Sequence, residues 1–236
     1  MLARLVTISV FALAPVMALG HGDVAPQPVD TDALPDIGEE WLEENPYRAE
    51  AAGEDVWAAA VKIGASGYNQ NCARCHGLEV VSGGLAPDLR YLEANFDGDE
   101  WYVERFVHGY SQNGVTKMPA FGELLGQKAG WAIRTYIETR PDDGALDDHA
   151  VELKEIRDDL VAKAGALESG KAYADMEPDL AAHKAVLQGI VGEVLTASGA
   201  PVADSAVSRA LADLNGTPEG VKAAADTLTI GLSAAE

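Results

Sequence analysis

The feature that most constrains this chain is the run Cys72-Ala73-Arg74-Cys75-His76, which contains the only two cysteines among its 236 residues. C-x-x-C-H is the attachment signature of c-type haem. The two thiols add across the vinyl groups of the haem, and the adjacent histidine becomes an axial ligand of the iron. The sequence therefore predicts one covalent haem c, held by Cys72, Cys75 and His76.

Two other interpretations of the cysteine pair are open. A thioredoxin-like redox pair expects a βαβ context and needs no histidine directly after the second cysteine. A structural zinc site needs two further cysteine or histidine ligands at suitable spacing, and none lies nearby in the sequence. The histidine that follows Cys75 favours haem attachment over both.

Residues 1–20 have the order of a secretory signal peptide. Arg4 supplies the basic n-region, an apolar stretch runs over Leu5–Leu19, and small residues follow around Ala18 and Gly20. The apolar stretch is shorter than the roughly 20 residues that a transmembrane helix needs, and no later segment comes closer. We expect a cleaved signal, a periplasmic location and no membrane span; an uncleaved N-terminal anchor is the alternative.

The charge of the chain is strongly acidic, with 38 acidic against 17 basic residues and a net charge of −21. Such a surface repels nucleic acid and anionic lipid, so its partners are expected to be proteins that present cationic patches. Residues 41–140 hold 14 acids and 9 bases, whereas residues 141–236 hold 18 acids and 7 bases. Most of the excess charge therefore lies in the last part of the chain.

A haem iron bound by one histidine takes a second axial ligand, and Met118 is the candidate. It lies 42 residues after His76 in the loop-like stretch Val115–Gly122, whose proline and glycines argue against a helix. A thioether sulfur is soft and neutral, so it favours Fe(II) and raises the potential. Met118 could instead be a core residue, with His108 as the second ligand of a bis-histidine haem.

Apolar periodicity predicts helices on both sides of this loop. Trp57–Tyr68 is apolar along one face at a period of 3.6 residues and runs into the haem motif. A second helix is predicted over residues 131–137 and ends before Pro141. Asp99–Phe106 is a third helical candidate. The predicted fold class is all-α, built around one haem.

The order of these features resembles class I cytochrome c: C-x-x-C-H, the segment Gly83–Leu89, a helix, a Met-Pro loop and a C-terminal helix. Met118 matches the position where that family places its distal ligand. In the family the first and last helices cross, with a glycine on the first against an aromatic residue on the last. Gly64 with Trp131 or Tyr136 is similar to that contact.

The resemblance also suggests residues around the haem. Pro87 looks like the proline whose carbonyl oxygen accepts a hydrogen bond from the haem histidine, which would fix the tautomer of that histidine. Arg90, Tyr91 and Trp101 are candidate hydrogen-bond donors to the haem propionates, because buried carboxylates need compensation. Arg90 could equally be a surface cation, and Trp101 a core residue.

The haem domain is predicted to span residues 51–140. Residues 21–50 are rich in proline and acid and indicate an extended arm, with Trp41 and Tyr47 as anchors. The alanine-rich residues 141–236 indicate an acidic helical appendage for packing or docking, without a second haem site or a catalytic constellation. Helices are expected there over residues 146–167, 178–196, 202–214 and 218–232.

Four segments carry a finer resemblance to the periplasmic cytochromes c that accept electrons from PQQ-dependent methanol and ethanol dehydrogenases. They are Asn45–Arg48, Gly64–Glu79, Ser82–Leu92 and Trp131–Arg140. The resemblance covers residues 21–140 and stops before residues 141–236. It implies a mono-haem electron carrier, not an enzyme, which takes electrons from such an alcohol dehydrogenase. Its acceptor would be a downstream cytochrome c or a terminal oxidase.

The alternative is a haem enzyme, or a haem-bearing subunit of an enzyme complex. Either would need an open iron position with acid or base residues on the distal side. A Met-Pro loop closes that position, and no distal His/Arg pair is evident in the sequence. The sequence therefore favours the carrier.

Overall fold

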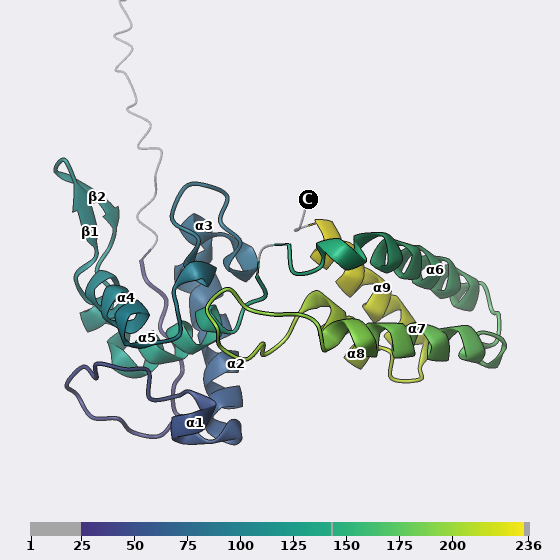
Figure 1. Ribbon diagram of the computed structural model, residues 1–236, viewed down its shortest axis with the longest axis horizontal. Helices are drawn as coiled ribbons and strands as arrows, with labels where there is room; N and C mark the ends of the chain where they lie inside the picture. The colour runs from purple at the N-terminus through teal and green to yellow at the C-terminus, as the bar shows by residue number, and fades with distance from the viewer. Residues whose placement is uncertain (1–24, 143, 234–236) are drawn as a thin grey trace, which may run out of the picture.

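The computed structural model describes residues 25–142 and 144–233, which form two lobes (Figure 1). The first lobe holds residues 25–142 and the second residues 144–233. The signal peptide predicted over residues 1–20 lies outside the described residues. Among the described residues, no helix is long and apolar enough to cross a membrane.

The first lobe is built on two crossing helices, α2 (Glu54–Asn71) and α5 (Gly122–Glu138). Helix α4 (Phe96–His108) packs against α5 and begins at an Asn95 cap, whose side-chain oxygen accepts from the amide of Gly98 at 3.1 Å. This cap makes α4 start earlier than the predicted Asp99–Phe106, and the helix also ends two residues later. Short elements complete the lobe: α1 (Ala49–Ala52), α3 (Ala73–His76), η1 (Leu78–Val80) and η2 (Leu89–Tyr91).

The crossing of α2 and α5 depends on Gly64. A methyl group at this position would overlap the backbone carbonyl of Ala132 and lie 2.9 Å from Cβ of Tyr136. Of the two predicted aromatic neighbours, Tyr136 is therefore the one at the glycine. Trp131 packs instead in a separate apolar cluster with Leu34, Tyr47 and Ala60.

Gly64→Ala is expected to destabilise the protein by about 1–3 kcal/mol, because the obstacle is backbone and the two helices must move apart. Gly165→Ala is the matched control. Gly165 lies in α6 (Ala150–Glu168), where an added methyl group would meet nothing within 4 Å, so the change should stabilise by about 0.5–1 kcal/mol. Denaturant unfolding of both variants measures the difference. Equal stability of the two would contradict the close packing.

The N-terminal arm wraps this lobe without forming a helix or strand over residues 25–48. The ring of Trp41 lies 5.7 Å from that of Phe106 and 6.3 Å from that of Trp131, between centroids. Tyr47 is fully buried and donates its hydroxyl to the carbonyl oxygen of Pro35 at 3.3 Å. Both predicted anchors therefore contact the core.

The fold is mostly helical, as predicted, but the stretch around Met118 is a hairpin and not a loop. Strand β1 (Tyr110–Gln112) pairs antiparallel with β2 (Val115–Met118). The turn consists of Asn113 and Gly114, at φ 53° and 75°. Asn-Gly is a strong hairpin signal because both residues tolerate positive φ. The prediction of a loop was therefore wrong for Val115–Met118, where the sequence carried a hairpin signal, and right for residues 119–121, which form neither helix nor strand.

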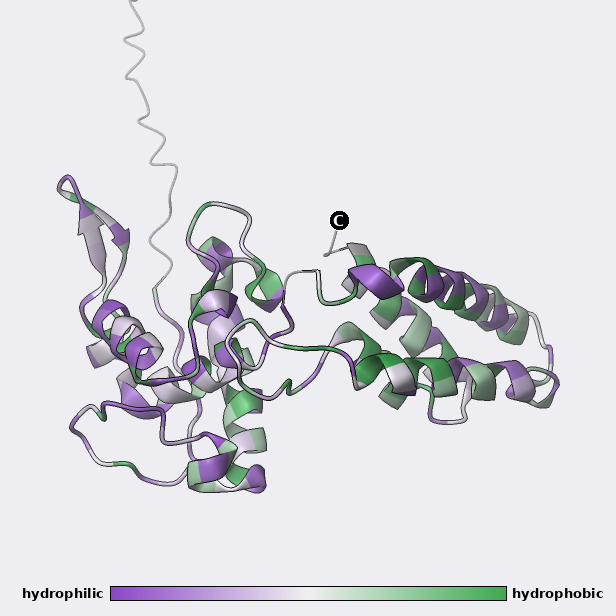
Figure 2. Ribbon diagram, in the orientation of Figure 1, coloured by the Kyte–Doolittle hydropathy of each residue, from purple (hydrophilic) through white to green (hydrophobic). Residues whose placement is uncertain are grey.

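The second lobe packs four helices around a core of its own (Figures 1 and 2). They are α6, α7 (Glu177–Val191), α8 (Ala206–Asp213) and α9 (Pro218–Ser233), with the short turns η3 (Asp147–His149) and η4 (Tyr173–Asp175). Three predicted helix bounds are wrong. Helix α6 starts at Ala150 and not at residue 146, because the preceding residues 147–149 form the 3-10 turn η3. Helix α7 stops at Val191 and not at residue 196, because the following residues bond to the first lobe. Helix α8 starts at Ala206 and not at residue 202, because Ser205 and Ser208 form a capping box there.

Residues 192–205, here called the bridge segment, join α7 to α8 and lie against the first lobe (Figure 1). The amide of Asp142 donates to the carbonyl oxygen of Leu195 at 2.9 Å. The amide of Ala94 donates to that of Ser198 at 2.9 Å, and the amide of Ala203 to that of Thr139 at 3.3 Å. Backbone hydrogen bonds therefore hold the two lobes together.

Candidate haem site

The C-x-x-C-H motif forms its own short helix at the end of α2. The amide of Cys72 still donates to Tyr68 at 2.7 Å, and α3 then turns the chain so that the amide of His76 donates to the carbonyl oxygen of Cys72 at 3.0 Å. Gly77 ends the helix at φ 84°, where a methyl group would overlap the carbonyl of Val81. The motif is thus presented by consecutive tight turns.

No disulfide joins Cys72 to Cys75. Cys72 is half-buried, and burial, with the nearby Cys75, raises its pKa to about 12. A thioredoxin-like cysteine needs the opposite shift and a βαβ setting, whereas this motif follows a helix in a lobe whose described strands form a single hairpin. The structure therefore argues against the redox-pair interpretation.

The imidazole of His76 is oriented by Pro87. Its Nδ1 lies 2.9 Å from the carbonyl oxygen of Pro87. Because a carbonyl oxygen only accepts, Nδ1 carries the proton and Nε2 keeps its lone pair for a metal ion. The contact that the resemblance implied therefore leaves the second ring nitrogen of His76 able to bind a metal ion.

The surroundings of the motif are apolar, as a porphyrin requires. Ala73, with Cys72 beside it, belongs to a buried cluster that also contains residues of α2, α4 and α5. Three large apolar side chains of the segment after the motif are exposed, at 73% for Leu78, 78% for Leu85 and 56% for Tyr91. Large apolar side chains that are exposed within one segment fit a surface that another group covers. The residues present therefore fit a haem.

Met118 lies at the end of β2, paired with Tyr110, and its half-buried side chain packs against the same apolar cluster as Cys72. Gly109, at φ 70°, allows this end of the hairpin to close, because a side chain there would lie 2.5 Å from the carbonyl oxygen of Met118. His108, the alternative ligand, is the last residue of α4. The hairpin thus holds Met118 against the apolar cluster of the lobe that carries the motif.

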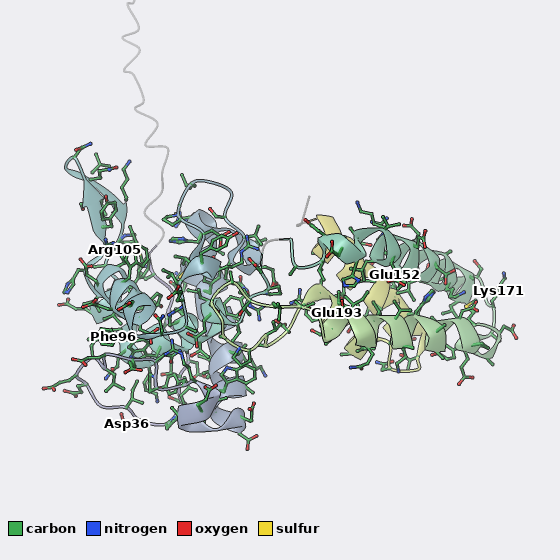
Figure 3. The ribbon with its side chains drawn as sticks, in the orientation of Figure 1. Asp36, Phe96, Arg105, Glu152, Lys171 and Glu193 are labelled. Carbon is green, nitrogen blue, oxygen red and sulfur yellow. The ribbon has the colours of Figure 1, made fainter. Side chains whose placement is uncertain are left out.

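The three candidate propionate donors lie in different settings. Arg90 is buried and bonds to Asp88, with its NH2 group 2.6 Å from Oδ2. Burial alone would raise the pKa of Asp88, but the hydrogen bonds from Arg90 hold it below its usual value. Tyr91 is exposed. The ring of Trp101, on α4, is covered by the guanidinium of Arg105, 5.1 Å from the ring centroid. Figure 3 shows Arg105 near the base of the hairpin.

A buried ionic cluster, which was not predicted from the sequence, joins α4, α5 and the N-terminal arm. Asp99 on α4 accepts from Arg134 of α5 at 2.9 Å and from Arg48 of the arm at 2.8 Å, and Arg48 also pairs with Glu138 at 2.8 Å. Arg134 and Asp99 are fully buried. The sequence did contain a signal for this cluster. Arg134 and Glu138 are charged residues four positions apart on the helix that carries the apolar stripe.

The comparisons with known proteins identify the family. A family model described as cytochrome C oxidase, cbb3-type, subunit III matches residues 59–137. Cytochrome c550 of Pseudomonas aeruginosa is 54% identical over 123 residues, which make up 52% of this chain and 83% of that protein. The chain belongs to the class I c-type cytochromes. Membership implies a covalently bound haem c, and the family match lies wholly within the first lobe.

Two more distant relatives are enzymes of Pseudomonas putida. Quinohemoprotein alcohol dehydrogenase ADH IIB is 32% identical over 100 residues, 40% of this cytochrome and 14% of the dehydrogenase. For ADH-IIG the identity is 31% over 85 residues, 36% of this cytochrome and 11% of the dehydrogenase. Each match covers a small part of the enzyme. No solved structure was found to match this cytochrome.

Proposed function

We propose that this cytochrome is a periplasmic electron carrier with a single haem, attached to Cys72 and Cys75 and ligated by His76 and Met118. The observation that carries this proposal is the hydrogen bond from His76 Nδ1 to Pro87, because it leaves Nε2 free for the iron. When bound, the haem supplies one-electron chemistry. The chain holds and orients it, and the apolar cluster excludes water from it.

The proposed electron donor is a PQQ-dependent alcohol dehydrogenase, and the acceptor is a downstream cytochrome c or a terminal oxidase. Two quinohemoprotein alcohol dehydrogenases contain a stretch of 85–100 residues related to this chain, about the length of one haem domain. A domain related to this cytochrome is therefore part of the same protein as an alcohol dehydrogenase in these two relatives. Stopped-flow reduction of the cytochrome by a purified quinoprotein alcohol dehydrogenase tests the donor.

The second candidate is a haem-bearing subunit or a haem enzyme with an open iron position. The packing of the half-buried Met118 against the apolar cluster of the first lobe favours the carrier. Optical spectra separate the two. A methionine-to-iron charge-transfer band in the oxidised protein, without rapid carbon monoxide binding in the reduced protein, is expected for the carrier.

Reduction by the dehydrogenase should slow markedly as the ionic strength rises from about 0.01 M to 1 M, where the Debye length falls from roughly 30 Å to 3 Å. A carrier leaves its partner after each turnover, so its interface is small and steered by long-range charge. The net charge of −21 supplies that field. Reduction by an uncharged small reductant is the control. An equally flat salt response in both reactions would indicate apolar docking instead.

A further inference from the structure

The backbone after the haem motif is strained at Glu79 and Val80. Their φ angles are 54° and 67°, so two consecutive residues with side chains lie in the left-handed region. This region is costly for any residue with a Cβ, and a β-branched valine is a particular outlier there. Such a backbone persists only where the surrounding contacts hold it.

Two contacts hold the strained segment from inside the first lobe. The side chain of Val80 is fully buried in the apolar cluster of the haem lobe. The hydroxyl of Tyr68 donates to the carbonyl oxygen of Gly77 at 2.9 Å. These contacts fix the positions on either side of Glu79 but do not involve its carboxylate.

The carboxylate of Glu79 is held by two arginines from different lobes. Its Oε2 lies 3.2 Å from the guanidinium of Arg140, just after α5, and 3.4 Å from that of Arg209 on α8. Asp204 of the bridge segment pairs with both arginines, at 3.1 Å from Arg209. Arg140 is buried, and its guanidinium lies 4.4 Å from the ring centroid of Tyr136. The second lobe thus reaches the segment that follows the haem motif.

The segment held in this way connects His76 to Pro87, the residue that accepts the hydrogen bond from its imidazole. We propose that Glu79 is a positioning residue for the haem site, and that Arg209 of the second lobe, together with Arg140, holds it in place. The second lobe then helps to keep the proximal side of the haem closed to water. The inference rests on the haem attachment proposed above.

The test uses Glu79→Gln and Arg209→Gln in the full-length holoprotein, with Arg209→Lys as the conservative variant. Lys222→Gln is the matched control, because Lys222 pairs with Glu168 at 2.8 Å within the second lobe. Hydrogen exchange at residues 77–82 should become roughly three- to tenfold faster in the two Gln variants, the gain expected from losing partly exposed ion pairs. Arg209→Lys should keep most of the protection, and Lys222→Gln all of it.

The reduction potential separates positioning from a simple charge effect. Removing the negative charge of Glu79 disfavours Fe(III) and by itself raises the potential, whereas removing the cation of Arg209 lowers it. Release of the segment admits water to the haem. This lowers the reduction potential in both variants, because the solvent exposure of a haem is one of the determinants of its potential. Both side chains are partly exposed, so solvent screens their direct charge effects and the effect of water entry prevails. We therefore expect both Gln variants to shift downward. A raised potential in Glu79→Gln, or unchanged exchange in both, would overturn the inference.

Failure of the haem proposal gives a different result. In that case the wild-type protein carries no covalent haem, and no potential is measured for any variant. Exchange at residues 77–82 would still respond to the substitutions, because the ion pairs belong to the polypeptide. The two proposals therefore fail separately.

Discussion

Cys72→Ser and Cys75→Ser are each expected to leave the haem on a single thioether with a shifted absorption band, or to abolish covalent attachment. The double variant should carry no covalent haem. Serine has nearly the same size as cysteine, but its hydroxyl does not replace the thiol that adds to a vinyl group. Haem staining after denaturing electrophoresis and the pyridine haemochrome spectrum measure the loss.

The two thiols also differ in exposure, which makes the single variants informative. Cys72 is half-buried against the apolar cluster, whereas Cys75 is exposed. His76 keeps its hydrogen bond to Pro87 in both variants, so any haem that remains still meets an oriented histidine. A pyridine haemochrome spectrum identical to that of the wild type, in either variant, would refute attachment at that cysteine.

Met118→Ala is expected to remove the methionine-to-iron charge-transfer band, lower the potential and allow carbon monoxide to bind the reduced protein. Axial ligands set haem potentials over a range of about 0.8 V, so a fall on the order of 0.1 V is expected when the neutral sulfur is lost. Spectroelectrochemical titration measures the potential. The fold should survive, because the side chain is only half-buried.

His108→Ala is the control for this ligand. His108 ends α4, and Gly109 and the hairpin follow it directly. We expect His108→Ala to keep the charge-transfer band and to change the potential little. If His108→Ala lowers the potential and Met118→Ala leaves the band intact, the haem is bis-histidine and the proposed ligand is wrong.

The main helices could be predicted because their information is local. The stripe in Trp57–Tyr68 and the one ending at Pro141 correspond to α2 and α5, since a 3.6-residue apolar period reports a buried helix face directly. The hairpin could also have been predicted, because Asn113-Gly114 favours a tight turn of its own accord. The end of α7 could not, because residues of the bridge segment bond to another lobe.

By itself the sequence determined the haem chemistry that this cytochrome can support. Cys72, Cys75 and His76 are adjacent in the chain, so their grouping needs no tertiary fold, and a signature of this kind is recognised from spacing alone. The resemblance to class I cytochromes c added Met118 and Pro87 as candidates. The structure then placed the Pro87 carbonyl 2.9 Å from Nδ1 of His76, which the spacing of the two residues does not dictate.

Only the tertiary structure decided where the charges lie. The sequence counts acids and bases but does not say which of them are buried. Asp99 and Arg134, 35 residues apart, meet inside the first lobe, and Glu79 and Arg209, 130 residues apart, meet between the lobes. Contacts at such separations depend on how the helices pack, because Coulomb attraction acts through space and leaves no periodic trace in the chain. The second lobe's link to the haem motif therefore became visible only in the folded molecule.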